Sequence, residues 1–125
     1  MIDTAANSLP QVRAGTIKAY ALTATTRLAA APDIPTVDEA GLPGLHALNW
    51  QAVFLPKGAP QDIVARLNGA IVSALADATV RRRLAGIGQE IFAREQQTPH
   101  ALADYQKAEI EKWWPIVKEA NIKAE

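Results

Sequence analysis

Two short polar stretches hold the side chains best suited to binding a small molecule. Asp3, Thr4 and Asn7 follow a brief apolar start and precede a helical pattern, and Thr25 lies in a threonine cluster after the next apolar run. Hydroxyls and amides can donate to a carboxylate, and a helix N-terminus adds free N–H groups and partial positive charge. These stretches predict anion binding at strand ends, the usual place in open α/β sheets. The pattern alone favours the alternative, in which Thr4 and Asn7 only cap the helix and its turn.

Enzyme chemistry and metal binding have little support in this sequence. His46 follows a Pro-Gly turn and His100 lies in the first turn of a predicted helix, and neither stands beside the other members of a triad. Neighbouring carboxylates, such as Asp38 and Glu39, lack the spacing of a metal motif, and no glycine-rich phosphate loop is present. We therefore expect no catalysis, no metal and no cofactor.

Strands and helices must position the polar loops. Apolar runs predict short strands over residues 1–3, 17–24, 47–55 and 90–93. A short helix over 8–14, ended by Gly15, separates the first two strands and gives a compact βαβ-like unit.

Longer helices dominate the second half. Apolar residues at intervals of three and four predict a helix from Pro60 to Leu75, and Asp77 can cap a second, shorter one. Thr98 followed by proline predicts the start of a last helix, which Pro115 is expected to kink. Upstream, Thr36 with a glutamate three residues later predicts a capping box on a short helix.

Composition limits the class of protein. The chain has 125 residues, is 49% hydrophobic, and carries 13 basic and 13 acidic side chains. This balance gives no sustained positive field for nucleic acid or an anionic membrane. No cysteine is present, which excludes disulfides, thiolate zinc sites and a thiol nucleophile in this chain. We expect one domain-sized unit with a packed core.

Four segments in register resemble one family, the Bug-type extracytoplasmic solute receptors, which serve tripartite tricarboxylate transporters. The segments are residues 9–23, 32–44, 49–60 and 113–123. The resemblance covers almost the whole chain. It implies an α/β fold, namely part of a type II periplasmic binding protein with a small sheet and several flanking helices. It also implies binding of a small carboxylate between two lobes, and delivery to membrane subunits of the transporter.

The resemblance also implies a set of ligand-binding residues and a division of the chain. Family members place an aspartate and small polar residues where Asp3, Thr4 and Asn7 stand, and cleft-facing residues where Asn49 and Trp50 stand. With Thr25, these six form the expected ligand-binding set. Gln51-Ala52 departs from the Phe-Gly or Gln-Gly common in the family, and the absent glycine changes how closely the backbone can approach a ligand.

By the same resemblance, residues 1–50 correspond to most of the second lobe. Residues 51–125 correspond to the crossover and the C-terminal helices that pack on the first lobe. The chain looks like the C-terminal portion of a longer, truncated receptor.

Two readings of such a chain remain open. It binds solute as part of a receptor, or it is a non-binding fragment that serves as a helical oligomerisation module. In either case we expect a homo-oligomer, because the helices carry apolar faces without a partner. The family resemblance implies the periplasm. This chain itself shows no signal peptide, so we expect it to be cytoplasmic if it is expressed as it stands.

Overall fold

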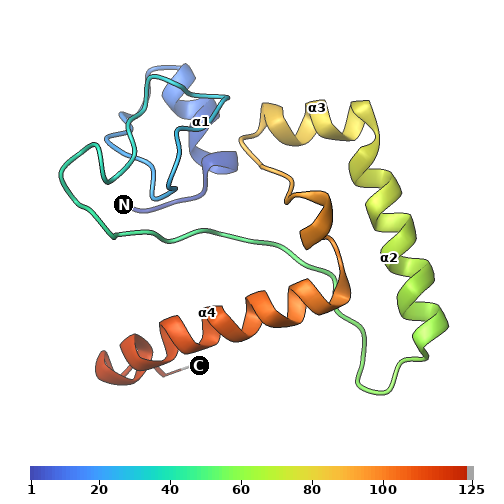
Figure 1. Ribbon diagram of the computed structural model, residues 1–125. Helices are drawn as coiled ribbons and strands as arrows, with labels where there is room; N and C mark the ends of the chain where they lie inside the picture. The colour runs from blue at the N-terminus through green and yellow to red at the C-terminus, as the bar shows by residue number, and fades with distance from the viewer. Residues whose placement is uncertain (124–125) are drawn as a thin grey trace. The chain divides into compact units, whose positions relative to one another are not determined.

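The computed structural model describes residues 1–123, which form helices and irregular chain (Figure 1). In chain order the elements are α1 (Ala5–Arg13), α2 (Gln61–Ala76), α3 (Ala78–Gly86), the 3-10 helix η1 (Arg94–Gln96) and α4 (Pro99–Glu119). The chain divides into two compact units. The first joins Met1–Val53 to Ala74–Ile91, and the second joins Phe54–Ser73 to the chain from Phe92 onward.

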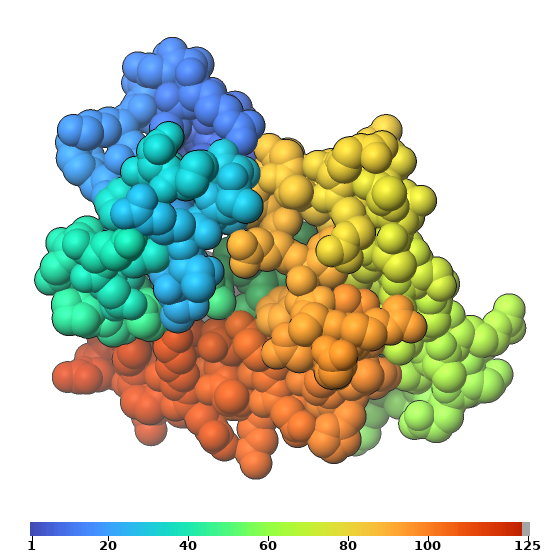
Figure 2. Space-filling view, turned by 45° about the horizontal axis from the view of Figure 1, so that its top comes forward, coloured from blue at the N-terminus to red at the C-terminus, as the bar shows by residue number. Residues whose placement is uncertain are grey.

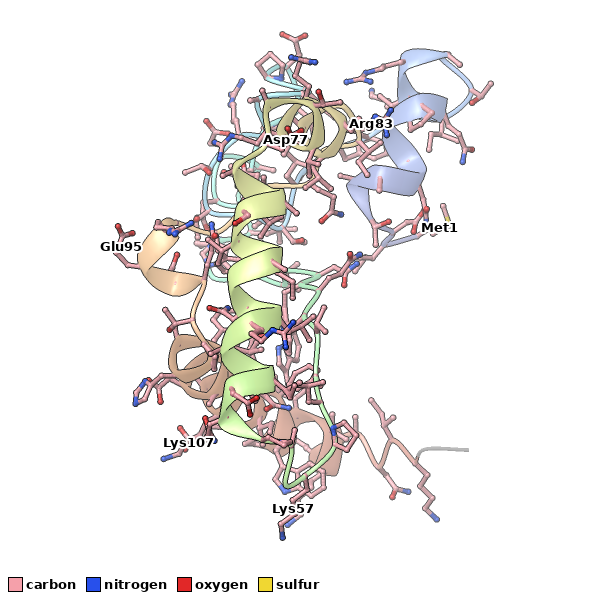
Figure 3. All side chains as sticks on the ribbon, turned by 90° about the vertical axis from the view of Figure 1, so that its right-hand side faces the viewer. Met1, Lys57, Asp77, Arg83, Glu95 and Lys107 are labelled. Carbon is pink, nitrogen blue, oxygen red and sulfur yellow. The ribbon has the colours of Figure 1, made fainter. Side chains whose placement is uncertain are left out.

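Helix starts in the second half follow the local signals in the sequence. The Asp77 carboxylate accepts hydrogen bonds from the backbone N–H groups of Thr79 (2.8 Å) and Val80 (3.0 Å), and Figure 3 marks Asp77 at the start of α3. The Thr98 hydroxyl accepts from the N–H of Ala101 at 3.1 Å and so caps α4. Both caps satisfy amides that have no partner within the helix. These two predictions, and that of α2, are confirmed.

Two helical predictions in the first half need correction. α1 begins at Ala5 rather than at residue 8, because Thr4 already takes the N-cap position. The capping box of Thr36 and Glu39 forms, with bonds of 2.8 and 3.3 Å, but only a turn follows it. Gly41, at φ 86°, ends this turn before a helix can propagate.

The expected small sheet is not confirmed. No strand forms within residues 1–123, and the nearest approach to one is a single parallel bridge between Leu22 and Thr36. The Leu22 N–H donates to the Pro35 carbonyl, and the Val37 N–H donates to the Leu22 carbonyl, both at 2.8 Å. An extended segment becomes a strand only when a neighbour completes its ladder. The segments 1–3, 47–55 and 90–93 have no such neighbour here.

The core of the first unit lies where α1 meets the loop residues of the chain's first third. Leu9 of α1 is 2% exposed, and Ile34, Thr36 and Val37 are also buried. Figure 2 shows the blue N-terminal segment, which includes α1, beside the cyan loop segment that follows it in the chain. The Arg13 guanidinium at the end of α1 donates to two backbone carbonyls, Gly86 at 3.4 Å and Ala30 at 3.0 Å.

The second unit is held by contacts around η1. The Asn68 amide of α2 donates to the Gln97 carbonyl at 2.9 Å, and the Gln97 amide donates to the Phe92 carbonyl at 2.6 Å. Phe92 meets Tyr105 of α4 edge to face, with ring centres 5.5 Å apart. α4 continues past Pro115 to Glu119, so the proline does not end it.

No helix within residues 1–123 is both long and apolar enough to cross a bilayer by itself. Only the bent pair α2–α3, taken together, reaches that length and composition.

Candidate functional site

The Asp3 carboxylate organises the loop before α1. One of its oxygens accepts from the Thr4 N–H at 2.7 Å and from the Asn7 amide at 3.2 Å, and the other accepts from the Ser8 hydroxyl at 3.0 Å. These bonds, that of Thr4 first, hold the pKa of Asp3 below its usual value, because each favours the charged form. Asp3 is therefore an anion that accepts hydrogen bonds. It repels a ligand carboxylate and attracts a hydroxyl or amine.

The N-terminus of α1 keeps hydrogen-bonding groups available. Thr4 is the N-cap, yet its side chain makes no capping bond. Its carbonyl accepts from Asn7 and Ser8, whereas the N–H groups of Ala5 and Ala6 donate to no group within residues 1–123. Two amides and one hydroxyl thus stand at the positive end of a nine-residue helix. Such donors can hold a carboxylate oxygen.

The structure bears on the capping role expected of these side chains. The hydroxyl of Thr4 does not cap the helix. The side chains of Asn7 and Ser8 each donate a hydrogen bond to the Asp3 carboxylate and not to the helix backbone, so they fix the position of that carboxylate. The simple capping role that the pattern alone favoured is therefore wrong for the side chain of Thr4.

The other three predicted residues lie further along the same compact unit. Thr25 is exposed in a run of bends, and Asn49 is exposed in the extended chain that also holds the half-buried Trp50. Two bonds tie these stretches together: the Thr23 hydroxyl donates to the Ala47 carbonyl at 2.6 Å, and the Ala47 N–H donates to the Thr23 carbonyl at 3.2 Å. Thr25 and Asn49 are each two residues from this junction.

The six predicted residues form two groups. Asp3, Thr4 and Asn7 are joined directly, and Thr25 with Asn49 lies near the junction just described. No hydrogen bond connects Asp3, Thr4 or Asn7 to Thr25 or Asn49 in the part of the chain that is described.

The loop between Thr25 and Asn49 is fixed by paired charges. The Arg27 guanidinium donates to both oxygens of Glu39, at 3.0 and 3.1 Å, and to the Pro32 carbonyl at 2.8 Å. This pairing lowers the pKa of Glu39 and raises that of Arg27. Arg27 is thus already engaged by a carboxylate of its own chain.

A second carboxylate holds the next turn. Asp38 accepts from the Gly44 N–H at 3.1 Å and contacts the His46 ring nitrogen at 2.8 Å. The contact with His46 is the main reason that the pKa of Asp38 lies below its usual value. This arrangement shapes a turn and lacks the nucleophile that a triad needs. Among residues 1–123, no three His, Cys, Asp or Glu side chains are grouped to hold a metal ion.

The sequence patterns missed the backbone amides of Ala5 and Ala6. Backbone donors have no residue-type signature, so only the exact helix start reveals them. Placing the N-cap at Thr4 instead of at residue 7 or 8 would have pointed to these amides.

Comparison with known proteins gives a consistent result. The model of the tripartite tricarboxylate transporter family receptor matches residues 1–122. Protein BugT of Bordetella pertussis is 34% identical over 92% of this chain and 34% of its own length. The UPF0065 protein in the TAR-I ttuE-ttuC' intergenic region of Agrobacterium vitis is 37% identical over 95% of this chain and 34% of its own. The chain thus spans about a third of the length of these relatives.

Solved structures agree with the family match. MatC from Rhodopseudomonas palustris with bound malate superposes with a TM-score of 0.84 at 41% identity, over 90% of this chain and 38% of that one. The periplasmic binding protein BugD gives a TM-score of 0.84 at 30% identity, over 94% of this chain and 39% of that one. The fold is therefore that of part of a periplasmic binding protein. The chain belongs to the tripartite tricarboxylate transporter receptor family, a family of transport receptors and not of enzymes.

Proposed function

We propose that this chain supplies one side of a solute-binding site for a small carboxylate, in a receptor that serves a tripartite tricarboxylate transporter. The family match over residues 1–122 supports the receptor role. MatC, which is 41% identical, is described with bound malate, and this supports a small hydroxy-dicarboxylate as the class of ligand. Kinship with BugD favours a periplasmic location.

The observation that carries the proposal is the unused N-terminus of α1. The amides of Ala5 and Ala6 and the hydroxyl of Thr4 have no partner within the described residues, although all three residues are half-buried. A carboxylate placed there gains up to three hydrogen bonds and the favourable helix dipole. No free cation is required, in keeping with the engagement of Arg27 by Glu39.

Asp3 then acts as a positioning and selecting group. Its carboxylate is held by three donors and stays ionised, so it repels a second anion at the same point. It can accept a hydrogen bond from a ligand hydroxyl, such as that of a 2-hydroxy acid. Asn7 fixes Asp3 and retains one amide hydrogen for the ligand or a bridging water.

Thr25, Asn49 and Trp50 are assigned to the same ligand site. Their position near the Thr23–Ala47 junction supports this, since that junction fixes both stretches. In this proposal, residues 1–50 form most of one lobe of a type II receptor. Residues 51–125 are then the crossover and the helices that pack on the other lobe, and the sheet is completed by strands outside this chain. Closure of the two lobes over the anion would deliver it to the membrane subunits.

The alternative function is a truncated, non-binding module that oligomerises through its helices. Exposed apolar side chains on the last helix favour it: Ile110 is 55% exposed, Trp114 61% and Ile116 50%. Exposed patches of this kind commonly mark interaction surfaces. Ligand affinity is the property that separates the two functions.

Titration of the 125-residue chain with malate, followed by amide NMR, tests the proposal. We expect weak but saturable binding, because one side of a cleft leaves the ligand partly in water. The amides of Ala5 and Ala6 should shift most. The uncharged diamide of malate should give no such shift, because it lacks the carboxylates.

Two variants make the test specific. Thr4→Val removes the available hydroxyl and should weaken malate binding by about 1.5–3 kcal/mol, the usual value of a hydrogen bond to a charged group. Ser73→Ala removes an exposed hydroxyl that bonds the Gly69 carbonyl in the other unit, and should leave binding unchanged. Malate shifts that avoid residues 3–7, or equal binding by all three proteins, would overturn the assignment of the site.

A further inference from the structure

A contact between two side chains closes the loop formed by residues 38–46. The Nε2 atom of His46 lies 2.8 Å from one oxygen of Asp38, and the Gly44 N–H donates to the other oxygen at 3.1 Å. An ionised carboxylate can only accept hydrogen bonds, so the His46 ring is the donor. Both partners belong to this chain, and the loop is therefore closed without any residue from outside it.

The residues that flank this loop are bonded to two consecutive residues, Leu22 and Thr23. Before the loop, the Val37 N–H donates to the Leu22 carbonyl at 2.8 Å. After the loop, Ala47 makes two bonds to Thr23: its N–H donates to the Thr23 carbonyl at 3.2 Å, and its carbonyl accepts from the Thr23 hydroxyl at 2.6 Å. Both ends of the closed loop are thus fastened to the same short stretch of chain.

This frame carries two of the residues assigned to the ligand site. Thr25 follows Thr23 by two residues, and Asn49 follows Ala47 by two residues. Two residues of chain span at most about 7 Å, so a displacement of Ala47 also displaces Asn49. The contact made by His46, one residue before Ala47, therefore affects where Asn49 stands relative to Thr25.

The contact between His46 and Asp38 is suited to fixing a position more than to stabilising the fold. Both side chains are partly exposed, 31% for His46 and 41% for Asp38. Exposed pairs of this kind contribute little to the free energy of folding, because water competes for both partners. Removal of the His46 ring should therefore leave the fold intact, so that its effect on ligand binding can be measured separately.

We propose that His46, held by Asp38, is a positioning residue of the carboxylate site. It fixes Ala47 and so sets the place of Asn49 relative to Thr25. His46 acts through these residues and makes no contact with the ligand itself. The inference rests on the proposed function, because it assigns a role within the same site.

Amide NMR of the 125-residue chain, titrated with malate, tests the inference. His46→Leu removes the donor and should weaken malate binding about tenfold, the effect of misplacing one hydrogen bond to a charged group. The malate-induced shifts of Thr25 and Asn49 should decrease most. His46→Gln keeps an N–H donor of similar reach and should restore both the affinity and these shifts. The amides of Ala5 and Ala6 should still shift in every variant.

His100 provides a matched control. Its Nδ1 atom lies 2.9 Å from the Asp104 carboxylate in the other unit, so the contact has the same chemistry. His100→Leu should leave malate binding unchanged. Without ligand, hydrogen exchange at the Ala47 amide should become faster in His46→Leu but not in His100→Leu, and circular dichroism spectra should stay the same.

The inference and the proposed function fail in different ways. If the unsubstituted chain shows no malate shift at Ala5 and Ala6, the proposed function is refuted, and the role of His46 falls with it. If those shifts are present but His46→Leu binds malate normally, only the positioning role is overturned, even where exchange at Ala47 is faster. An equal loss of affinity in His100→Leu, or no rescue by His46→Gln, would overturn it as well.

Discussion

Substitution of Gly88 tests how tightly the turn after α3 holds α1. Gly88 has φ 74°, and an added Cβ would lie 2.9 Å from a methyl of Leu9, 2.9 Å from one of Leu28 and 3.1 Å from the Cβ of Ala5. The left-handed conformation costs an L-residue about 1–2 kcal/mol. Overpacking adds about 1–3 kcal/mol, because the buried Leu9 has little room to move. Lower entropy of the unfolded chain offsets about 0.4–1 kcal/mol.

Gly88→Ala should therefore lower the free energy of unfolding by about 2–4 kcal/mol. Substitutions at two other glycines separate the cost of the backbone conformation from the cost of overpacking. Gly15 has φ 71° and no atom within 4 Å of an added Cβ, so Gly15→Ala should show only the conformational cost. Gly69 lies within α2 with open space around it, and Gly69→Ala should stabilise by about 0.5–1 kcal/mol.

Urea denaturation followed by circular dichroism at 222 nm measures all three variants under one set of conditions. The reasoning requires the order Gly69→Ala, Gly15→Ala, Gly88→Ala from most to least stable. If Gly88→Ala and Gly15→Ala had equal unfolding midpoints, the close packing of α1 against the turn would be refuted.

Further predictions concern caps, the arginine contact and pH. Asp77→Ala should destabilise the protein by about 1 kcal/mol, because two amides of α3 lose their acceptor, whereas Asp77→Asn should retain most of that stability, as urea midpoints would show. Arg13→Met should cost about 1 kcal/mol and increase hydrogen exchange around residues 84–88, since two carbonyls lose a donor; unchanged exchange there would contradict the contact. The pKa of Asp3 is lowered by folding, so its contribution to stability is present above the ordinary aspartate value of 3.8 and is lost as pH falls through the lower folded value. Asp3→Asn should therefore reduce the acid sensitivity of the unfolding midpoint; an unchanged pH profile would show that its three hydrogen bonds do not persist in solution.

Helices were predictable from the sequence because their signals are local. The periodicity of α2, the Asp77 cap and the Thr98-Pro99 start all act within a few residues, and each appears in the structure. The capping box at Thr36 also formed as predicted, but the helix did not. A box fixes the first turn only, and Gly41 follows too soon for propagation.

The strands were not predictable in the same way. An apolar run such as residues 17–24 indicates that a segment suits a sheet. Whether its backbone hydrogen bonds form depends on a second segment elsewhere in the sequence. Leu22 forms one β-bridge, with Thr36, whereas residues 47–55 form none within the described part of the chain. β-Structure is therefore the part of the expected fold that is not confirmed for residues 1–123.

The candidate site shows the same distinction. The cluster of Asp3 and Asn7 was foreseeable, because residues four apart at a helix start lie close together. The amides of Ala5 and Ala6 were not, since they depend on where the helix begins. The roles of all six residues in binding stay predictions, those of Asp3, Thr4 and Asn7 as well as those of Thr25, Asn49 and Trp50.

The Arg13 contact and the close packing at Gly88 have a consequence for the order of folding. Both join α1 to residues more than 70 positions later, so the first unit is interrupted in sequence by Phe54–Ser73. At a synthesis rate of about 5–20 residues per second, roughly 4–16 s pass between the addition of the last residue of α1 and the addition of Ile91. Leu9 has no complete burial site during that interval. Chaperone contact with the nascent α1 segment should therefore last until the turn after α3 has left the ribosome.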